Sequence, residues 1–293
     1  MTVSNAAPMS YTVAELMICA MAREIRDGEF LAQGIATHLP TSAYFLAKRT
    51  HAPHCWFLYS VGGSLSTRHG QVSLLGMEAL ALEAPLKRIG YAEIVCDLLP
   101  GVSFMEFSRP AQLDRYGNTN NVVIGAHAAP KLRLPGVGGI ADFSPYESHR
   151  AFLYVPNHAR KIFVERLDFL SGVGGLTGHS HDARARLGVT GRGTQRLVSN
   201  LGVFEFDALG MHTISLHAGV DADQVRAATG FTVDIPSTPA ITPVPSVDQL
   251  RLIREEIDPF AARELEFLSG AARLTRIRAI LACEQATIGK PPS

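Results

Sequence analysis

Cys55-Trp-Phe-Leu-Tyr-Ser-Val-Gly-Gly63 is the most informative stretch of this 293-residue chain for predicting its architecture. Its first five residues are too apolar and aromatic for a strand at the edge of a sheet, so we expect a central strand that is buried on both faces. The two glycines follow the end of this strand, which is where ligands bind in open parallel sheets. Ser60 is therefore a candidate nucleophile or hydrogen-bond donor. A catalytic triad is not favoured, because the segment is not G-x-S-x-G and no partner histidine can be named.

Strands and helices alternate on both sides of this stretch. Residues 13–25 repeat apolar side chains at helical spacing behind Thr12 and Glu15, which together fit a capping box. Further strands are expected at residues 30–35, 122–124, 151–155, 161–164, 197–199, 203–206 and 212–216, and further helices at residues 41–48, 221–228, 247–257 and 261–281. This alternation predicts an α/β protein in three layers, an open and mostly parallel sheet covered by helices on both faces.

The chain divides into one large domain and a shorter C-terminal part. We expect residues 1–233 to form the α/β domain, because 46% of the chain is hydrophobic and only 18% is charged, which is enough to bury a full core. Residues 234–246 contain four prolines and predict an extended strap. We expect residues 234–293, the strap and the C-terminal helices, to pack on the domain or on a partner.

Charge and cysteine content exclude several classes of protein. Lys plus Arg and Asp plus Glu number 27 each, so no net field attracts nucleic acid or an anionic membrane, and a phosphate-bearing ligand must be held locally. Cys19, Cys55, Cys96 and Cys283 form no CxxC pair or zinc spacing, which favours reduced thiols in the core. Because neither a signal peptide nor an apolar run of about 20 residues is seen, we expect a soluble cytoplasmic protein.

A glycine-rich segment, Gly136-Val-Gly-Gly-Ile-Ala141, formally matches the G-x-G-x-x-G/A fingerprint of dinucleotide-binding proteins. The buried strand that should precede it and the acidic residue that should follow it are missing, so binding of NAD or FAD is not favoured. Two interpretations stay open. The segment is either a structural turn or a backbone loop that approaches a substrate carbonyl or a pantetheine chain.

A second glycine-rich segment, residues 172–194, predicts an irregular loop. Arg184 and Arg186 in this loop could bind phosphate groups, because guanidinium groups match phosphate oxygens, and simple surface charge is the alternative. His179 and His181 could chelate a metal only if a third ligand were supplied, and none is evident. We therefore expect no metal site.

Five stretches carry a family resemblance, and they occur in one order along the chain. They are Thr50-His-Ala-Pro53, Ala111-Gln-Leu-Asp-Arg-Tyr-Gly-Asn-Thr-Asn120, Leu134-Pro-Gly-Val-Gly-Gly-Ile-Ala141, Leu197-Val-Ser-Asn-Leu-Gly-Val-Phe-Glu-Phe206 and Leu252-Ile-Arg-Glu-Glu-Ile-Asp-Pro259. Taken together, they resemble the β subunits of family I CoA-transferases of the glutaconate CoA-transferase type. Val198–Phe206 and Ser215–Val220 give a closer resemblance, to the β subunit of the hydrolase that opens the last ring of steroids as a CoA ester.

The resemblance implies a fold, a partner and a class of substrate. The fold is the CoA-transferase (NagB/RpiA-like) fold, and the partner is an α subunit in a heterodimer or heterotetramer. The substrate is an acyl-CoA thioester, with coenzyme A as part of the substrate and no bound cofactor. Contacts with this substrate are expected at Gly62, Gly63, Asn118, Arg184 and Arg186.

One departure from the family controls the expected mechanism. In transferases of the glutaconate type a glutamate attacks the thioester, and the matching position here is Ser60, whose neutral hydroxyl cannot replace a carboxylate in that exchange. The resemblance to the ring-opening hydrolase implies a catalytic carboxylate on the α subunit. Ser60 then has a supporting role, and backbone N–H groups of Gly136, Gly138 and Gly139 stabilise an oxyanion. We expect hydrolytic cleavage of a C–C bond in a cyclic CoA ester. CoA transfer, decarboxylation and a non-catalytic scaffold subunit stay open as alternatives.

Overall fold

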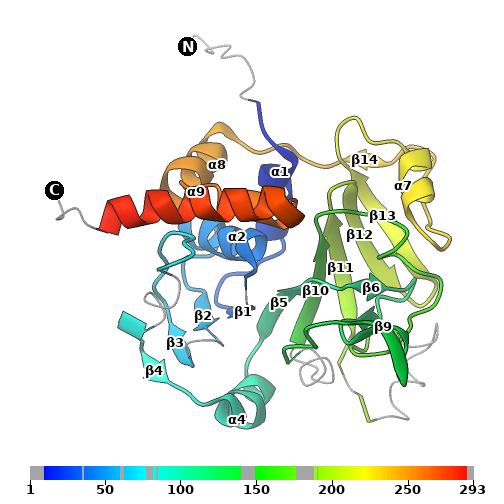
Figure 1. Ribbon diagram of the computed structural model, residues 1–293, viewed down its shortest axis with the longest axis horizontal. Coiled ribbons are helices and arrows are strands. Elements are labelled where there is room, and N and C mark those ends of the chain that lie inside the picture. Colours follow the sequence, from blue (N-terminus) through cyan, green and yellow to red (C-terminus); the bar gives the residue numbers. More distant parts are fainter. Residues whose placement is uncertain are drawn as a thin grey trace.

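The computed structural model describes residues 10–34, 36–59, 63–76, 82–83, 85–139, 149–175, 188–189 and 191–288. Within these residues a ten-stranded sheet runs through the molecule (Figure 1). Its strands, in spatial order, are β14 (Ala240–Ile241), β13 (Gly210–Leu216), β12 (Gly202–Asp207), β11 (Thr194–Ser199), β10 (His149–Val155), β5 (Phe104–Ser108), β1 (Phe30–Gln33), β2 (Trp56–Tyr59), β3 (Ser64–Ser66) and β4 (Lys87–Arg88).

The centre of the sheet is parallel and its flanks are mainly antiparallel. Strands β11, β10, β5, β1 and β2 run in one direction, while β12 and β13 on one side and β3 and β4 on the other pair antiparallel. Five of the nine pairings in this described sheet are parallel, which confirms the mostly parallel sheet. Strand β2 lies inside it, and Phe57 and Leu58 are fully buried, as a central strand requires.

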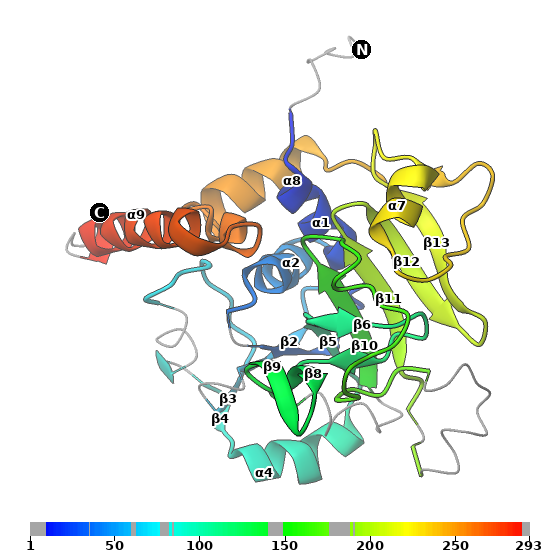
Figure 2. The same cartoon turned by 45° about the vertical axis from the view of Figure 1, so that its right-hand side comes forward.

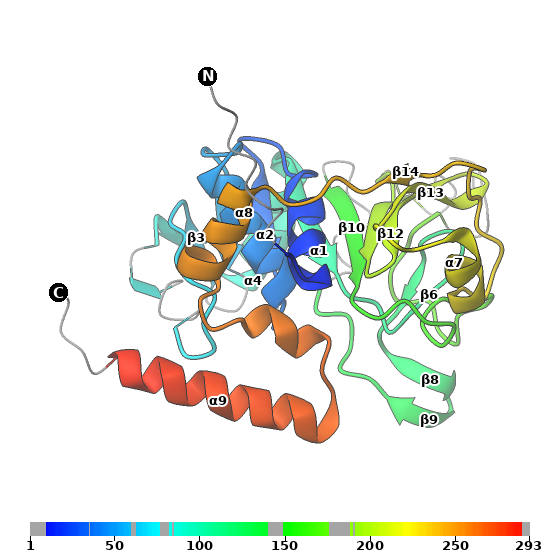
Figure 3. The ribbon, with the colours of Figure 1, turned by 90° about the horizontal axis from the view of Figure 1, so that it is seen from above.

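Helices cover both faces of this sheet. One face carries α1 (Val13–Ala22), α2 (His38–Arg49), α8 (Val247–Arg251), the π-helical turn η3 (Leu252–Ile257), the 3-10 turn η4 (Ala262–Glu266) and α9 (Gly270–Ile288) (Figure 3). Residues of α1, α2, η3, η4 and α9 share one hydrophobic cluster with Phe57, Met105 and Phe107 of the sheet. The C-terminal elements from Leu252 onward therefore complete the same core as the N-terminal helices.

The opposite face has two smaller clusters. Helix α4 (Tyr91–Glu93) continues as η1 (Ile94–Leu98) and η2 (Leu99–Gly101), which cover Ala32, Leu58 and Phe104 (Figure 2). Helix α7 (Ala222–Ala228) and β6 (Gln112–Leu113) close the second cluster around Phe204. Strand β6 pairs with β7 (Thr119–Asn120), and β8 (Val123–Ala126) pairs with β9 (Ala129–Arg133).

Three expectations from the sequence are wrong in detail. Residues 161–164 form no strand, because Phe163 makes only an isolated bridge to Leu113 and stacks on His158 instead. The helix expected at 261–281 is interrupted at residues 267–269, between η4 and α9. Of the four cysteines, Cys96 and Cys283 are exposed, so only the other two lie in the core. No helix in the described residues is long and apolar enough to cross a membrane.

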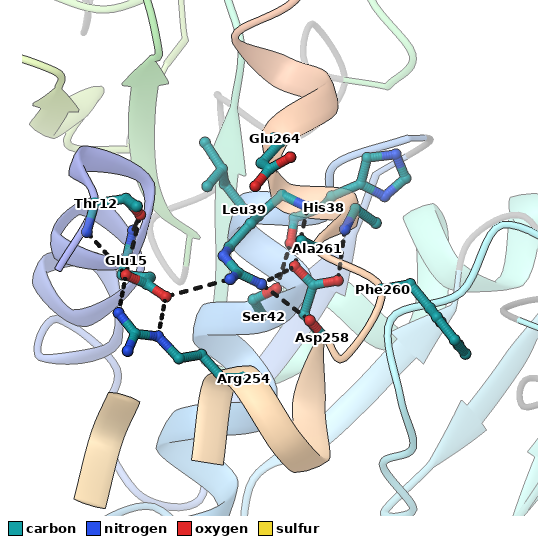
Figure 4. A network of polar contacts seen from close by, with 12 residues as sticks. Thr12, Glu15, His38, Leu39, Ser42, Arg254, Asp258, Phe260, Ala261 and Glu264 are labelled. Atoms are coloured by element: carbon teal, nitrogen blue, oxygen red, sulfur yellow. Dashed lines mark hydrogen bonds and ion pairs between the residues drawn. The ribbon is translucent and has the colours of Figure 1, made fainter. Parts of the chain in front are cut away.

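A buried network of charged side chains joins the N-terminal helix to the C-terminal turns (Figure 4). Glu15 accepts hydrogen bonds from the Thr12 backbone at 2.8 Å and from Arg254 Nε at 2.7 Å, and its Oε1 lies 3.2 Å from Nη2 of Arg263. Arg263 also donates to Asp258 at 2.9 Å. Burial raises the pKa of Glu15, but the bonds from Arg254 and Thr12 outweigh it and lower that pKa to about 2. Glu15 is therefore charged at neutral pH, and it links helix α1 to the C-terminal turns η3 and η4.

We predict that Glu15→Gln lowers the free energy of unfolding by about 3 kcal/mol, because it leaves buried guanidinium charge without its carboxylate. Urea unfolding followed by circular dichroism measures this loss. Glu256→Gln is the matched control, since Glu256 pairs with Arg49 and Arg251 at the exposed surface and should change the midpoint little. Equal effects of the two substitutions would contradict the prediction.

A tyrosine hydroxyl separates strands β1 and β5 near their carboxyl ends. The ladder between these strands ends at Leu31 opposite Met105. One residue further on, Tyr44 of α2 donates its hydroxyl hydrogen to the Ala32 carbonyl at 3.2 Å and accepts a hydrogen bond from the Phe107 N–H at 3.1 Å. The hydroxyl thus takes the place of a direct bond between the two backbones, and the strands part from this point onward.

We expect Tyr44→Phe to lower the free energy of unfolding by about 1–3 kcal/mol, because two buried backbone groups lose their partner. Chemical denaturation checks the value. Tyr11→Phe removes the hydroxyl of a partly exposed tyrosine and should leave the unfolding midpoint nearly unchanged. A Tyr44→Phe protein as stable as the parent would show that β1 and β5 can close on each other without the hydroxyl.

Candidate active site

The parting of β1 and β5 coincides with the place where the strand order reverses. The chain passes from β1 through α2 to β2 on one side, and then returns to β5 on the other side of β1. In open α/β sheets the crevice at the carboxyl ends of two such strands is the usual ligand site, because the following loops turn away in opposite directions. We call the space beyond Gln33 of β1 and Ser108 of β5 the switch-point crevice.

A buried carboxyl group lies on β5, two residues before the end of this strand. Glu106 is in the middle of β5, opposite Ala151 of β10, and is 8% exposed. Its Oε2 atom has no hydrogen-bond partner in the part of the chain that the structure describes. Burial raises the pKa of Glu106 to about 7. An uncompensated carboxyl in an apolar setting favours its neutral form, so Glu106 holds a proton for part of the time at neutral pH.

A second acidic group, Glu266, lies on the α2 side of the sheet at the same edge. It is 3% exposed and accepts a hydrogen bond from the Leu39 N–H, in the first turn of α2, at 2.7 Å. Tyr154 of β10 also hydrogen-bonds to it, and Arg109 lies 3.4 Å away. Burial raises the pKa of Glu266, and the bonds from Leu39 and Tyr154 oppose this. Because Glu266 is held by these bonds, it provides a fixed partner for Arg109, the residue that follows β5.

Arg109 brings positive charge to the edge of the crevice. It follows β5 directly after Ser108, and its side chain is 44% exposed although one nitrogen faces Glu266. The rest of its guanidinium group therefore reaches solvent beside the end of the strand. A guanidinium held in this way can bind a carboxylate or a phosphate group.

The glycine segment at 136–139 is tied to the same end of β5. Gly136 donates its N–H to the Asn121 carbonyl at 3.0 Å, and the Asn121 side chain accepts from the Ala111 N–H at 2.7 Å and donates to the Arg109 carbonyl at 3.3 Å. Gly136, Gly138 and Gly139 have φ angles of 107°, 58° and 99°, which favour glycine. The N–H of Gly136 is thus already bonded to an acceptor outside the glycine segment. The preceding strand, β9, is largely exposed, so the buried strand of a dinucleotide fingerprint is not present.

Two further residues selected from the sequence lie in different places. Gly63, with φ 54°, follows β2, and its carbonyl accepts the Ile89 N–H at 2.9 Å. Asn118 is buried and bonds to Asp114 at 2.8 Å and to the N–H of Gly174 at 2.9 Å. The adjacent Gly117 carbonyl accepts from Thr194 at the amino end of β11, so Asn118 is not brought to the switch-point crevice.

Four predicted site residues lie outside the described residues, namely Ser60, Gly62, Arg184 and Arg186. His179 and His181, for which no metal site was expected, also lie outside them. Strand β2 ends at Tyr59, immediately before Ser60 in the chain. Among the residues that the structure describes, no group of three or more His, Cys, Asp or Glu side chains could hold a metal ion.

Sequence reasoning missed Tyr44, Glu106, Arg109 and Glu266. A signal existed for Glu106 alone, since a glutamate interrupts the otherwise apolar run Phe104–Phe107. A charged side chain inside such a run is either evidence against a strand or a buried functional group. The other three residues become neighbours only when the sheet forms.

Known proteins share the sequence and the fold of this chain. The β subunit of the glutaconate CoA-transferase of Acidaminococcus fermentans is 29% identical over 85% of this chain and 94% of its own length. The cholesterol ring-cleaving hydrolase IpdB subunit of Mycobacterium tuberculosis is 37% identical over 54% of this chain and 62% of its own length. The crystal structure of the decarboxylase AibA/AibB superposes with a TM-score of 0.75 and 26% identity, covering 87% of this chain and 98% of that one.

Two of these similarities cover at least 85% of this chain. They confirm the resemblance to CoA-transferase β subunits and the expected α/β fold of this family. The family model described as "Coenzyme A transferase" matches residues 14–228, from α1 to the end of α7. The chain therefore belongs to the coenzyme A transferase family.

Proposed function

We propose that this chain is the β subunit of a two-subunit enzyme that hydrolyses a C–C bond in a cyclic acyl-CoA ester. The observation that carries the proposal is the residue type at position 60. Ser60 occupies the position that the family resemblance assigns to the attacking glutamate, and it directly follows β2. The relatives named above supply the context, since one is the β subunit of a CoA-transferase and another is a subunit of a ring-cleaving hydrolase.

The chemistry of CoA exchange argues against a transferase. Exchange needs a carboxylate that attacks the thioester, forms an anhydride and then accepts coenzyme A as a new thioester. A serine hydroxyl would form an ordinary ester, which is too stable to complete that cycle. Hydrolysis needs only an activated water, so it tolerates the loss of the nucleophilic glutamate.

We assign the base that activates this water to the α subunit, and supporting roles to this chain. The N–H groups of Gly138 and Gly139 are candidates for stabilising an oxyanion, at about 3 kcal/mol for each donor in a dry site. Gly136 shapes the turn that presents them. We expect the thioester beside the end of β2, where the sequence has glycine at positions 62 and 63.

The coenzyme A portion needs positive charge, which the balanced composition does not supply overall. We propose that Arg184 and Arg186 bind its phosphate groups. Arg109, at the carboxyl end of β5, is a separate candidate for binding an anionic group of the substrate. Asn118 holds the turn at 114–118 against Gly174 and so positions the start of the loop that carries Arg184 and Arg186. No other cofactor is required by this chemistry.

Decarboxylation is the second candidate function. The similarity to the decarboxylase AibA/AibB, with a TM-score of 0.75, favours it specifically. Both reactions create negative charge on a carbon next to a carbonyl group, and both need a proton to be delivered there. Release of CO2 from a carboxylated CoA ester would identify this alternative.

A non-catalytic scaffold subunit, which only shapes the pocket of its partner, is distinguished by binding measurements. When Ser60 or Gly138 is altered, a scaffold would lose assembly but not affinity for the CoA ester.

We predict different effects for two substitutions of Ser60 in the complex with the α subunit. Ser60→Ala should lower kcat for ring opening by less than about tenfold, the value of one neutral hydrogen bond. Ser60→Glu should gain measurable CoA exchange between an acyl-CoA and a free carboxylate, because it restores the nucleophile. Chromatography of the CoA esters measures both activities.

Two outcomes would contradict this assignment. A Ser60→Ala complex that binds the CoA ester but does not turn over, together with an acyl-serine trapped by mass spectrometry in the parent, would make Ser60 the nucleophile. Full activity of this chain purified without an α subunit would remove the need for a carboxylate on the partner.

A further inference from the structure

We propose that Glu106 is the acid that delivers a proton to the substrate carbon from which the C–C bond breaks. This inference rests on the proposed hydrolase function and adds a catalytic residue to this chain. It places one carboxyl group of the reaction on the β subunit, in addition to the base assigned to the α subunit.

The position of Glu106 in the sheet supports this role. Glu106 stands two residues before the end of β5, at the level where the Tyr44 hydroxyl separates β5 from β1. Its neighbour on β10 is Ala151, whose methyl group leaves more space than the larger side chains further along that strand. Glu106 therefore belongs to the part of β5 that is still paired with β10 but no longer with β1, and we place its carboxyl group against the switch-point crevice on this ground.

One oxygen of the Glu106 carboxyl group differs in its hydrogen bonding from the polar groups of the Glu15 network. Every described polar side chain of the Glu15 network is bonded, whereas Oε2 of Glu106 has no hydrogen-bond partner among the described residues. A buried carboxyl without a partner destabilises the fold relative to an apolar side chain of similar size. Groups that are retained at such a cost in stability are concentrated at functional sites.

The protonation state of Glu106 also suits an acid. Tyr44 of α2 interacts electrostatically with Glu106, and on β10 the titratable residues His149 and Arg150 stand opposite Phe104 and Met105. Burial alone raises the pKa of Glu106 to about 7, without any contribution from a neighbouring charge. A carboxyl group that keeps its proton near neutral pH can act as an acid beside an anionic intermediate.

The reaction balances with these two carboxyl groups. The carboxylate of the α subunit takes a proton from water, and the hydroxide adds to the ring carbonyl. The C–C bond then breaks, and its electron pair moves to the neighbouring carbon as an enolate. Glu106 gives its proton to that carbon, and the proton held by the α subunit returns through solvent to Glu106. Water has then supplied the OH of the new carboxyl group and, in net terms, the new C–H hydrogen.

The test uses Glu106→Gln in the complex with the α subunit, with a CoA thioester that carries a cyclic 1,3-diketone as the probe. Glutamine keeps the shape but has no acidic proton, so kcat should fall by at least about 100-fold. Binding of the probe, assembly and Tm should be retained, and Tm should not fall, because no hydrogen bond of Oε2 is lost. The matched control is Thr213→Val on β13, which also removes a buried oxygen without a described partner and should keep full activity.

The pH profile separates catalysis from structure. In the parent complex kcat should fall as the pH rises through about 7, because only the protonated carboxyl can donate. Glu106→Asp should recover part of the rate and keep this alkaline limb, whereas Glu106→Gln should lack it. The aspartate variant also keeps the test decisive if the glutamine variant does not assemble.

The outcomes distinguish the two proposals. A Glu106→Gln complex within about tenfold of the parent rate would overturn the role of Glu106 while the hydrolase function stands. The role of Glu106 is equally overturned if Glu106→Asp assembles but shows no alkaline limb. A parent complex that binds the probe without opening its ring would overturn both proposals together.

Discussion

The architecture around the candidate active site depends on one hydroxyl group. Tyr44 is completely enclosed between α2 and the sheet, and its hydroxyl bridges the Ala32 carbonyl and the Phe107 N–H. Parallel strands normally satisfy such groups by bonding to each other. Because the hydroxyl intervenes, β1 and β5 share only a short ladder and then part. The two strands can thus part without leaving these buried backbone groups unpaired.

The buried carboxyl groups among the described residues are of two kinds, those with hydrogen-bond or ion-pair partners and one whose Oε2 atom lacks a partner. Glu15 and Asp258 are fully paired with arginines, so they fasten the helices of one face to each other. Glu266 is likewise bonded by a helix N–H and a tyrosine. Glu106 differs because burial alone sets its pKa, and no arginine or lysine among the described residues stabilises its charged form. Paired charges give rigidity, whereas an unpaired carboxyl can give or take a proton.

The family membership and this distribution of charge lead to one chemical picture. On the proposed function, Ser60 stands at the position of the CoA-transferase nucleophile, and burial raises the pKa of Glu106 on β5 to about 7. Loss of the nucleophile would then remove exchange, while an acid beside an enolate would suit bond cleavage. In this picture the fold is constant and the reaction is set by where the carboxyl groups stand.

Features that depend on neighbours in the chain could be predicted from the sequence. The capping box of Thr12 and Glu15, the central strand 56–59 and the alternation of strands and helices are local patterns, and the structure contains all three. The site arises instead from tertiary contacts. Strand β5 was not foreseen because Glu106 interrupts its apolar pattern, and burial of a carboxyl depends on which strands flank it. The meeting of Tyr44 with Phe107 spans 63 residues and that of Arg109 with Glu266 spans 157, and no local spacing encodes such contacts.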